Sequence, residues 1–347
     1  METRPAPFSL RAAALVGAGI VLGFMIWLVG FATNDDLLAK AGSVHPTQFD
    51  QAPSFVGLLP IEKRGHDARP FAVALHEGNL LVSFLGSDEI LEYSSDFKRS
   101  RFVRALGGED ASLTGLLVEG DRLYAANFRS GELLILEYPS GKLLNAFGLF
   151  PDGKTPMKLF GLAYASGSLY ASNPQTNQML AISTQTVPGI KEEGELLVGF
   201  PAASAKDFQL SFPTFAAVTP DGRLLVSDVG HKEIKAFTCS GRQAHRFDTS
   251  AAAAFSAPMG IAFDDLPSPE LRSLADSVFN PSGVYHQGRI HVVDAGQSRI
   301  KVFNPFGKYV LTYGHELRQP NGIAIDTRRR LIVVADADLE SLAIYRY

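Results

Sequence analysis

Six residues spaced along the chain are the first candidates for chemistry, because each directly precedes a recurring position that is usually glycine. A hard cation takes several oxygen ligands, and zinc takes about four nitrogen, oxygen or sulfur donors. The six residues are Phe71, Thr114, Phe160, Thr214, Met259 and Asn321. Only Asn321 has a side chain suited to a metal, so the set argues against a metal site. Thr114, Thr214 and Asn321 remain candidates for contact with a ligand.

A second recurring position holds only asparagine or aspartate, each time at the end of an apolar run. These residues would form an acidic site if they converged. Asx side chains also hydrogen-bond backbone amides about two residues on and so stabilise turns. Because the same residue types recur in five repeats, we predict a structural, turn-capping role for Asn127, Asn173, Asp228, Asp294 and Asp336.

The remaining chemistry-bearing residues form no known catalytic pattern. None of the eight histidines stands at a metal-binding spacing from another, and the nucleophile-elbow, P-loop and dinucleotide motifs are absent. The single cysteine, Cys239, excludes an intrachain disulfide. A net charge of −4 argues against a nucleic-acid partner, which would need a basic face. We therefore expect no catalytic residue, metal or cofactor, and favour a protein that is not an enzyme.

The N-terminal region contains one uncharged apolar run, Ala12–Ala32, which is long enough to span a bilayer as a helix. Arg4 and Arg11 precede the run, and Asn34–Asp36 follow it. The positive-inside rule then places the N-terminus in the cytoplasm and the rest of the chain outside. Small residues near Ala32 leave a cleaved signal peptide open, but the length of the run favours a retained anchor. We expect a single-pass protein of a bacterial inner membrane, with its main domain in the periplasm.

The rest of the chain is a sixfold repeat. Each copy contains three or four short runs rich in Val, Ile, Leu, Tyr and Phe, separated by Gly, Asp, Asn or Ser turns. Four strands in about 40–50 residues are typical of a propeller blade. The usually small position recurs at Ala72, Gly115, Gly161, Phe215, Gly260 and Gly322. We therefore predict an all-β, six-bladed β-propeller preceded by one transmembrane helix, with the six residues considered first at the mouth of its central channel.

Blades 5 and 6 carry the most specific motifs. In blade 5, Pro258–Ala262 is followed by Val292–Asp294, Arg299–Phe303 and Tyr313–Gly314. Over about residues 55–347 the chain resembles the NHL family of β-propellers. The resemblance implies a six-bladed fold and says little about function. In propeller enzymes that are similar, such as gluconolactonases and the amidating-enzyme lyase domain, metal ligands come from the same channel positions.

The ends of the repeat indicate how the ring closes. The sixth copy ends at Tyr347 without a fourth strand, and Ser54–Pro60 is strand-like and belongs to no other copy. We predict that Ser54–Pro60 completes the last blade, because this pairing removes an open sheet edge. The domain organisation is then a cytoplasmic tip and anchor over 1–33, a tether over 34–53 and a propeller over 54–347.

One insertion, residues 264–287, interrupts blade 5. Ser268 and Pro269 form a helix start, since serine caps helices and proline suits their first turn. The apolar residues that follow have the spacing of one helix face: Leu271, Leu274, Val278 and Phe279. This face either packs on its own propeller or forms part of a partner-binding surface.

These observations favour a protein-interaction scaffold or binding module in a complex of the cell envelope, with a protein partner and a membrane contact through Ala12–Ala32. A rigid ring with variable loops suits protein docking. Two alternatives remain: a hydrolase or lyase with a site in the central channel, and a protein that binds a small ligand or glycan on one face. The fold does not choose among them, because propellers carry many unrelated functions.

Overall fold

The computed structural model describes residues 51–61, 69–98, 100–104, 111–148, 157–184, 196–200, 209–265 and 288–347. The chain divides into two units, 1–47 and 48–347, and all described residues belong to the second. Within the described residues, no helix is long and apolar enough to cross a membrane. The predicted span Ala12–Ala32 and the insertion helix with Leu271, Leu274, Val278 and Phe279 lie outside these residues.

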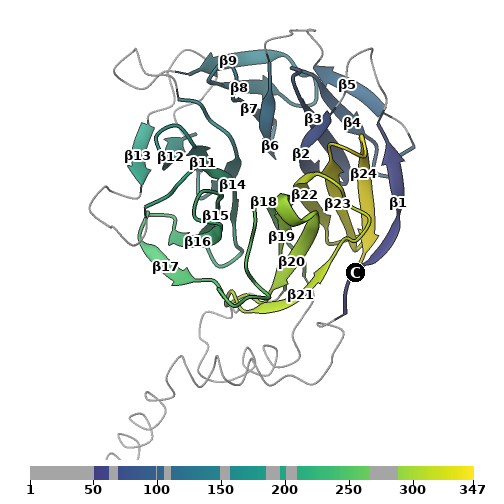
Figure 1. Ribbon diagram of the computed structural model, residues 1–347. Coiled ribbons are helices and arrows are strands. Elements are labelled where there is room, and N and C mark those ends of the chain that lie inside the picture. The colour runs from purple at the N-terminus through teal and green to yellow at the C-terminus, as the bar shows by residue number, and fades with distance from the viewer. Residues whose placement is uncertain are drawn as a thin grey trace, which may run out of the picture. The chain divides into compact units, whose positions relative to one another are not determined.

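Six four-stranded antiparallel sheets form the blades of a ring (Figure 1). Blade 1 comprises β2 (Arg69–His76), β3 (Asn79–Leu85), β4 (Ile90–Tyr93) and β5 (Ser100–Arg104). Blade 2 comprises β6 (Leu113–Glu119), β7 (Arg122–Asn127), β8 (Glu132–Glu137) and β9 (Leu143–Phe147). Blade 3 comprises β10 (Leu162–Ala165), β11 (Ser168–Asn173), β12 (Gln178–Ser183) and β13 (Leu196–Phe200).

The second half of the ring repeats this order. Blade 4 comprises β14 (Pro213–Val218), β15 (Arg223–Asp228), β16 (Glu233–Thr238) and β17 (Gln243–Arg246). Blade 5 comprises β18 (Pro258–Phe263), β19 (Ile290–Asp294), β20 (Arg299–Phe303) and β21 (Tyr309–Tyr313), with one short 3₁₀ turn, η3 (Ala295–Gln297). Blade 6 comprises β22 (Pro320–Asp326), β23 (Leu331–Asp336), β24 (Ser341–Arg346) and, from the other end of the propeller, β1 (Ser54–Pro60).

The strand β1 closes the ring, because it pairs antiparallel with β24 as the outermost strand of blade 6. The register runs from Ser54 opposite Arg346 to Pro60 opposite Ser341, with one irregularity between Phe55 and Gly57. The segment Ser54–Pro60 is therefore the fourth strand of blade 6, as the sequence predicts. The pairing joins strands from the two ends of the propeller, so the fourth strand of blade 6 depends on both ends being present.

The meander order gives the ring two faces. We call the face at which the innermost strands begin the upper face; it carries the connections between blades and the turns from second to third strands. The lower face carries the turns from first to second strands. Among the described residues, three of these lower turns contain only two residues, and in two of the three both residues have positive φ: Glu77 (49°) with Gly78 (85°), and Ser166 (50°) with Gly167 (78°). This is the geometry of a type I′ turn, which matches the twist of the paired strands.

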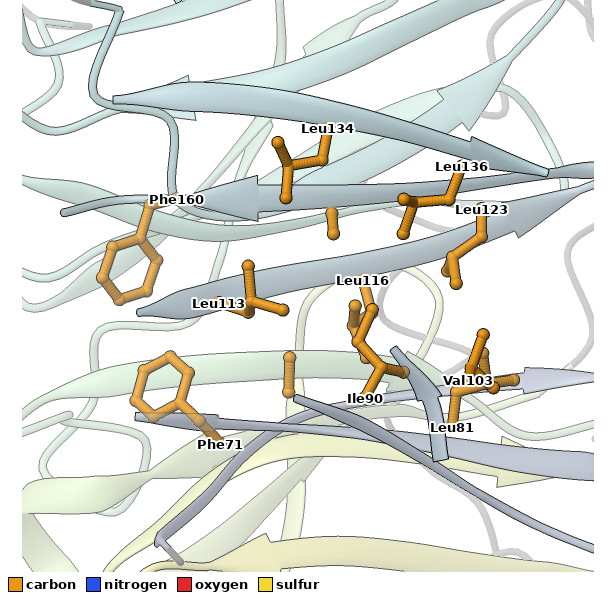
Figure 2. Packing of buried hydrophobic residues seen from close by; sticks show 12 residues of the cluster. Phe71, Leu81, Ile90, Val103, Leu113, Leu116, Leu123, Leu134, Leu136 and Phe160 are labelled. Atoms are coloured by element: carbon orange, nitrogen blue, oxygen red, sulfur yellow. The ribbon is translucent and has the colours of Figure 1, made fainter. Parts of the chain in front are cut away.

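Apolar side chains fill the space between neighbouring blades. Figure 2 shows the cluster between blades 1 and 2, in which Leu81 and Ile90 pack against Leu123 and Leu136. All four side chains are fully buried. Burial of a leucine or isoleucine side chain contributes about 1.5–3 kcal/mol. Similar clusters join the other blades, so blade-to-blade packing rather than any single sheet holds the core.

At the axis, the innermost strands approach one another so closely that glycine is required. A Cβ atom on Gly322 would lie 2.5 Å from the carbonyl oxygen of Phe71 in blade 1, and one on Gly260 would lie 2.6 Å from that of Asn321 in blade 6. Gly115 and Gly161 meet the backbone of the following blade in the same way. The recurring small residue therefore marks backbone contact between blades.

Substitution Gly322→Ala tests this contact. The added methyl group must displace backbone atoms of Phe71 and Ala72, so we expect a loss of about 1–3 kcal/mol in the free energy of unfolding. The matched control is Ala72→Gly, which removes a methyl group from the same position of blade 1 and costs about 1 kcal/mol or less. Urea unfolding measures both. Equal costs for the two variants would contradict a backbone contact at Gly322.

Candidate functional site

The channel-mouth residues lie where the sequence predicts, at the start of the innermost strands, but they do not form an open polar site. Thr114 and Thr214 are each 1% exposed, and Asn321 is 5% exposed. The Thr114 hydroxyl donates to the carbonyl of Phe160 in blade 3 (3.1 Å), and Asn321 Nδ2 donates to the carbonyl of Gln319 (3.1 Å). Thr214 Oγ1 lies within 3.5 Å of two backbone carbonyls. All three side chains therefore bond the protein's own backbone.

Phenylalanine rings occupy the axis beside these residues. The ring centroids of Phe71, Phe160 and Phe215 lie 5.6–5.8 Å from one another. These residues come from blades 1, 3 and 4, and blades 1 and 4 stand opposite each other in the ring. Rings from opposite blades can touch only at the axis, so the three side chains plug the channel near the upper face. Met259 of blade 5 and Phe128 pack against the same buried cluster.

A set of serines in the second strands also links neighbouring blades, and the sequence analysis missed it. Ser83 of blade 1 donates to the carbonyl of Leu113 in blade 2 (2.7 Å). The hydroxyls of Ser172 and Ser227 bond carbonyls of the innermost strands in blades 4 and 5. All three serine side chains are buried. The sequence signal that could have predicted these bonds is a serine near the end of the second apolar run, which occurs in three of the six repeats.

The Asn and Asp set binds backbone amides. Asp336 accepts hydrogen bonds from the amides of Arg318 (2.8 Å), Gln319 (3.0 Å) and Leu339 (3.1 Å). It therefore joins the turn that follows its strand to the connection that enters its own blade. The entering connection is also bonded by Asn127, Asp228 and Asp294. Asn173 accepts hydrogen bonds from amides of the turn that follows its own strand. The five residues are spread over five blades and do not converge.

Asp228, His231 and Glu233 bring potential metal ligands within 4.8 Å of one another on the upper face. The ammonium group of Lys235 lies 2.7 Å from Asp228 Oδ2 and 3.3 Å from Glu233 Oε1. Its side chain is 6% exposed. A buried cation therefore already pairs with both carboxylates, and its charge opposes a second cation. Lys301 and Asp294 repeat the arrangement in blade 5, with 3.6 Å between Nζ and Oδ2.

The most buried polar cluster lies at the base of the insertion. Asp264, which directly follows β18, accepts hydrogen bonds from the backbone amide (2.7 Å) and Nε (2.6 Å) of Arg289, on the opposite stem. His291 Nε2 lies 2.9 Å from Asp264 Oδ2, and its Nδ1 lies 2.9 Å from the Tyr313 hydroxyl. Arg289 also donates to the carbonyl of Gln51 (2.7 Å). The two stems of the insertion are thus joined to each other and to the start of the propeller.

The surroundings of this cluster shift its pKa values. Burial alone would raise the pKa of Asp264, but the hydrogen bond from His291 and the charge of Arg289 outweigh it and lower that pKa to about 2. Burial lowers the pKa of His291 against the opposing effect of Asp264. Burial raises the pKa of Tyr313. At neutral pH the cluster therefore contains an ionised aspartate, a neutral histidine and a neutral tyrosine.

Comparison with known proteins supports the fold. No family model and no curated protein matches the sequence. Among solved structures, virginiamycin B lyase from Staphylococcus aureus is similar with a TM-score of 0.56 at 13% identity, over 85% of this chain and 99% of that chain. A streptogramin B lyase structure has a TM-score of 0.54 at 13% identity, over 84% of this chain and 86% of that one. A chain of a nidogen/laminin complex has a TM-score of 0.51 at 13% identity, over 78% and 93%.

These similarities show a six-bladed β-propeller and nothing finer, because the sequence identity is low. The predicted propeller fold is confirmed. Two of these neighbours are lyases, and the third belongs to a protein complex, so the fold by itself does not select between catalysis and binding.

Substitution Phe160→Ala tests the axial plug. It removes a ring that contacts Phe71, Phe128 and Phe215, so we expect a loss of about 3–5 kcal/mol in the free energy of unfolding. The matched control is Phe212→Ala, since Phe212 is 47% exposed and its truncation costs about 0.5 kcal/mol. Guanidinium unfolding measures both. A loss of less than about 1 kcal/mol in the free energy of unfolding for Phe160→Ala is far below the cost of truncating a buried phenylalanine, and would mean that the axis is not packed.

The cluster at the insertion base predicts acid sensitivity. The pKa of Asp264 is lowered from its ordinary value of 3.8 to about 2. Its carboxylate therefore stabilises the fold at pH values above 3.8, and this stability is lost as the pH falls towards about 2. A histidine with a lowered pKa takes its proton more readily in the unfolded chain, so stability also falls below pH 6.5. We expect urea midpoints to decrease from pH 7 to pH 5, and to decrease less in His291→Gln. An unchanged pH dependence in that variant would contradict this role.

Proposed function

We propose that the protein is a binding propeller that acts as a protein-interaction scaffold, without catalytic activity in its central channel. The observation that carries this proposal is the plugged axis: Phe71, Phe160 and Phe215 meet there. The polar residues at the channel mouth, Thr114 and Asn321 among them, bond backbone carbonyls. A hydrolase or lyase with a channel site needs reactive groups and space at this point, whereas the described residues place contacting rings and internally bonded polar side chains there.

The proposal places the propeller at a membrane. The uncharged run Ala12–Ala32 anchors the chain in a bacterial inner membrane, with the N-terminus in the cytoplasm and the propeller in the periplasm. The resemblance of the repeat to NHL propellers supports a rigid ring that presents its faces to a partner. The nidogen/laminin neighbour shows that a ring of this architecture occurs in a protein complex.

The partner contact that we propose includes the blade 5 insertion. Its apolar residues Leu271, Leu274, Val278 and Phe279 have the spacing of one helix face. The two stems are joined by the Asp264–Arg289 pair, which is fully buried and bonded through both side chain and backbone. A fixed base lowers the conformational entropy that an insertion loses when it binds a partner.

Affinity purification from native membranes tests this function. Membranes are first washed with alkaline carbonate, and we expect the tagged full-length chain to stay in the pellet as an integral protein does. A partner protein should then co-purify with the wild type and should fall at least tenfold in the double variant Leu274→Asp, Phe279→Asp. The matched control is Leu143→Asp, on the exposed side of β9, which should retain the partner.

Three results would contradict the proposal. Recovery of the chain in the carbonate supernatant would contradict a membrane anchor at Ala12–Ala32. Equal partner recovery from the double variant would remove the insertion from the contact, and the absence of any co-purifying protein from wild-type membranes would remove the scaffold function itself.

A further inference from the structure

A cavity of about 450 Å³ opens on the lower face between blades 1 and 2. This volume lies within the range of small-molecule sites, which is about 300–1,000 Å³. The end of β2 and the turn after it contribute His76 and Glu77, and the turn β6–β7 contributes Gly120 and Asp121. The other lining residues are Asn79, Glu92, Arg101, Tyr138 and Pro139. The cavity is separate from the axis and from the insertion, and the proposed scaffold function does not use it.

The floor of the cavity is a buried carboxylate held in one orientation. Glu92 is 3% exposed. Its Oε1 accepts hydrogen bonds from Asn79 Nδ2 (2.9 Å) and from the Tyr138 hydroxyl (2.7 Å), and its Oε2 pairs with Arg101. Arg101 is fixed in turn by a hydrogen bond from Nη1 to the carbonyl of Pro139 (3.0 Å). These groups come from both blades, so the cavity is preorganised by the blade interface.

Three carboxylates line the cavity: two pair with arginines of the protein, and the third, Glu77, is exposed at the rim. Arg101 neutralises Glu92, and Arg122 lies 2.9 Å from Asp121 at the rim. Burial and the hydrogen bond to Glu92 raise the pKa of Tyr138, so its hydroxyl stays a donor. The lining therefore offers closely spaced donors and acceptors: an amide, an imidazole, a guanidinium, a phenol and carboxylates. Such a lining suits a neutral ligand with many groups that both donate and accept.

Two half-buried rings add an apolar wall. His76 and Tyr138 meet edge to face with their centroids 4.9 Å apart. Aromatic rings combine an apolar body with a polar end, so they pack on a ligand that has both C–H and O–H groups. A pyranose ring has this character: its hydroxyls donate and accept hydrogen bonds, and its carbon skeleton presents apolar patches.

We infer that the cavity between blades 1 and 2 binds a neutral pyranose, either as a free sugar or at the end of a glycan chain. The hydroxyls reach Asn79, Arg101 and the carboxylates of the floor and rim. The sugar ring lies against His76 and Tyr138. An anionic ligand is disfavoured because three carboxylates line the cavity and its one arginine already pairs with Glu92.

Saturation-transfer NMR on the full-length chain tests this inference. The chain is held in phosphatidylcholine nanodiscs, because maltoside detergents carry a pyranose that would compete. The probes are glucose, galactose, mannose and N-acetylglucosamine at about 10 mM, which detects millimolar dissociation constants. We expect at least one sugar to bind, and His76→Ala and Asp121→Ala each to weaken it by about tenfold, or 1.4 kcal/mol. Lys232→Ala, an exposed change on the upper face of blade 4, is the matched control and should bind as the wild type does.

Further arms separate the remaining outcomes. Glu77→Gln keeps size and shape at an exposed rim position, so it tests the site even if a more severe variant fails to fold. The sugar that binds is then compared with an oligosaccharide built from it. Binding of the oligosaccharide about tenfold tighter assigns the site to a glycan end, and equal binding assigns it to the free sugar; both results support a sugar site in the cavity. The inference is overturned if no sugar binds, or if sugar binding is unchanged in all three cavity variants. It is also overturned if a cationic probe, arginine amide, binds and the sugars do not. None of these outcomes bears on partner recovery from membranes.

Discussion

Backbone contact between neighbouring innermost strands is the constraint on which the ring depends. At Gly260 and Gly322 a carbonyl of the next blade lies where a side chain would begin, and Gly115 and Gly161 are in the same position. The first strands of all six blades can therefore meet around one narrow axis. That approach lets the apolar clusters between blades close and brings the second-strand serines within reach of the next blade. Strand β1 then seals the ring from the other end of the propeller.

The narrow axis also determines where function can reside. Phe215 occupies the position that glycine holds in four blades, and its ring meets Phe71 and Phe160 from other blades. Hydroxyls at the mouth of the channel bond backbone carbonyls and serve the ring itself. The remaining polar features lie between blades or at the base of the insertion, and each is preorganised by packing that the ring provides. This arrangement is the basis on which we propose binding at the faces and blade interfaces.

The sequence predicted the features that repeat. Strand runs, turn residues and the small position at Gly322 recur in register, so the six blades and the closing role of Ser54–Pro60 could be inferred from pattern alone. Features that occur once could not. Arg289 and Gln51 are 238 positions apart, and nothing local indicates that they meet. Phe215 interrupts the glycine pattern, and nothing in that pattern indicates that its ring would meet Phe71 and Phe160. The cavity around Glu92 depends on Tyr138 from the next blade, and such pairings need the folded ring.

A high-resolution crystal structure of the protein, with the axis inspected for ordered water and anomalous scattering, tests the central claim most directly. The account predicts contacting rings of Phe71, Phe160 and Phe215 near the upper face, with no water or metal between them. A continuous file of water molecules through the axis, or a metal ion bound at Thr114, Thr214 and Asn321, would contradict a plugged channel and would return a catalytic site there to consideration.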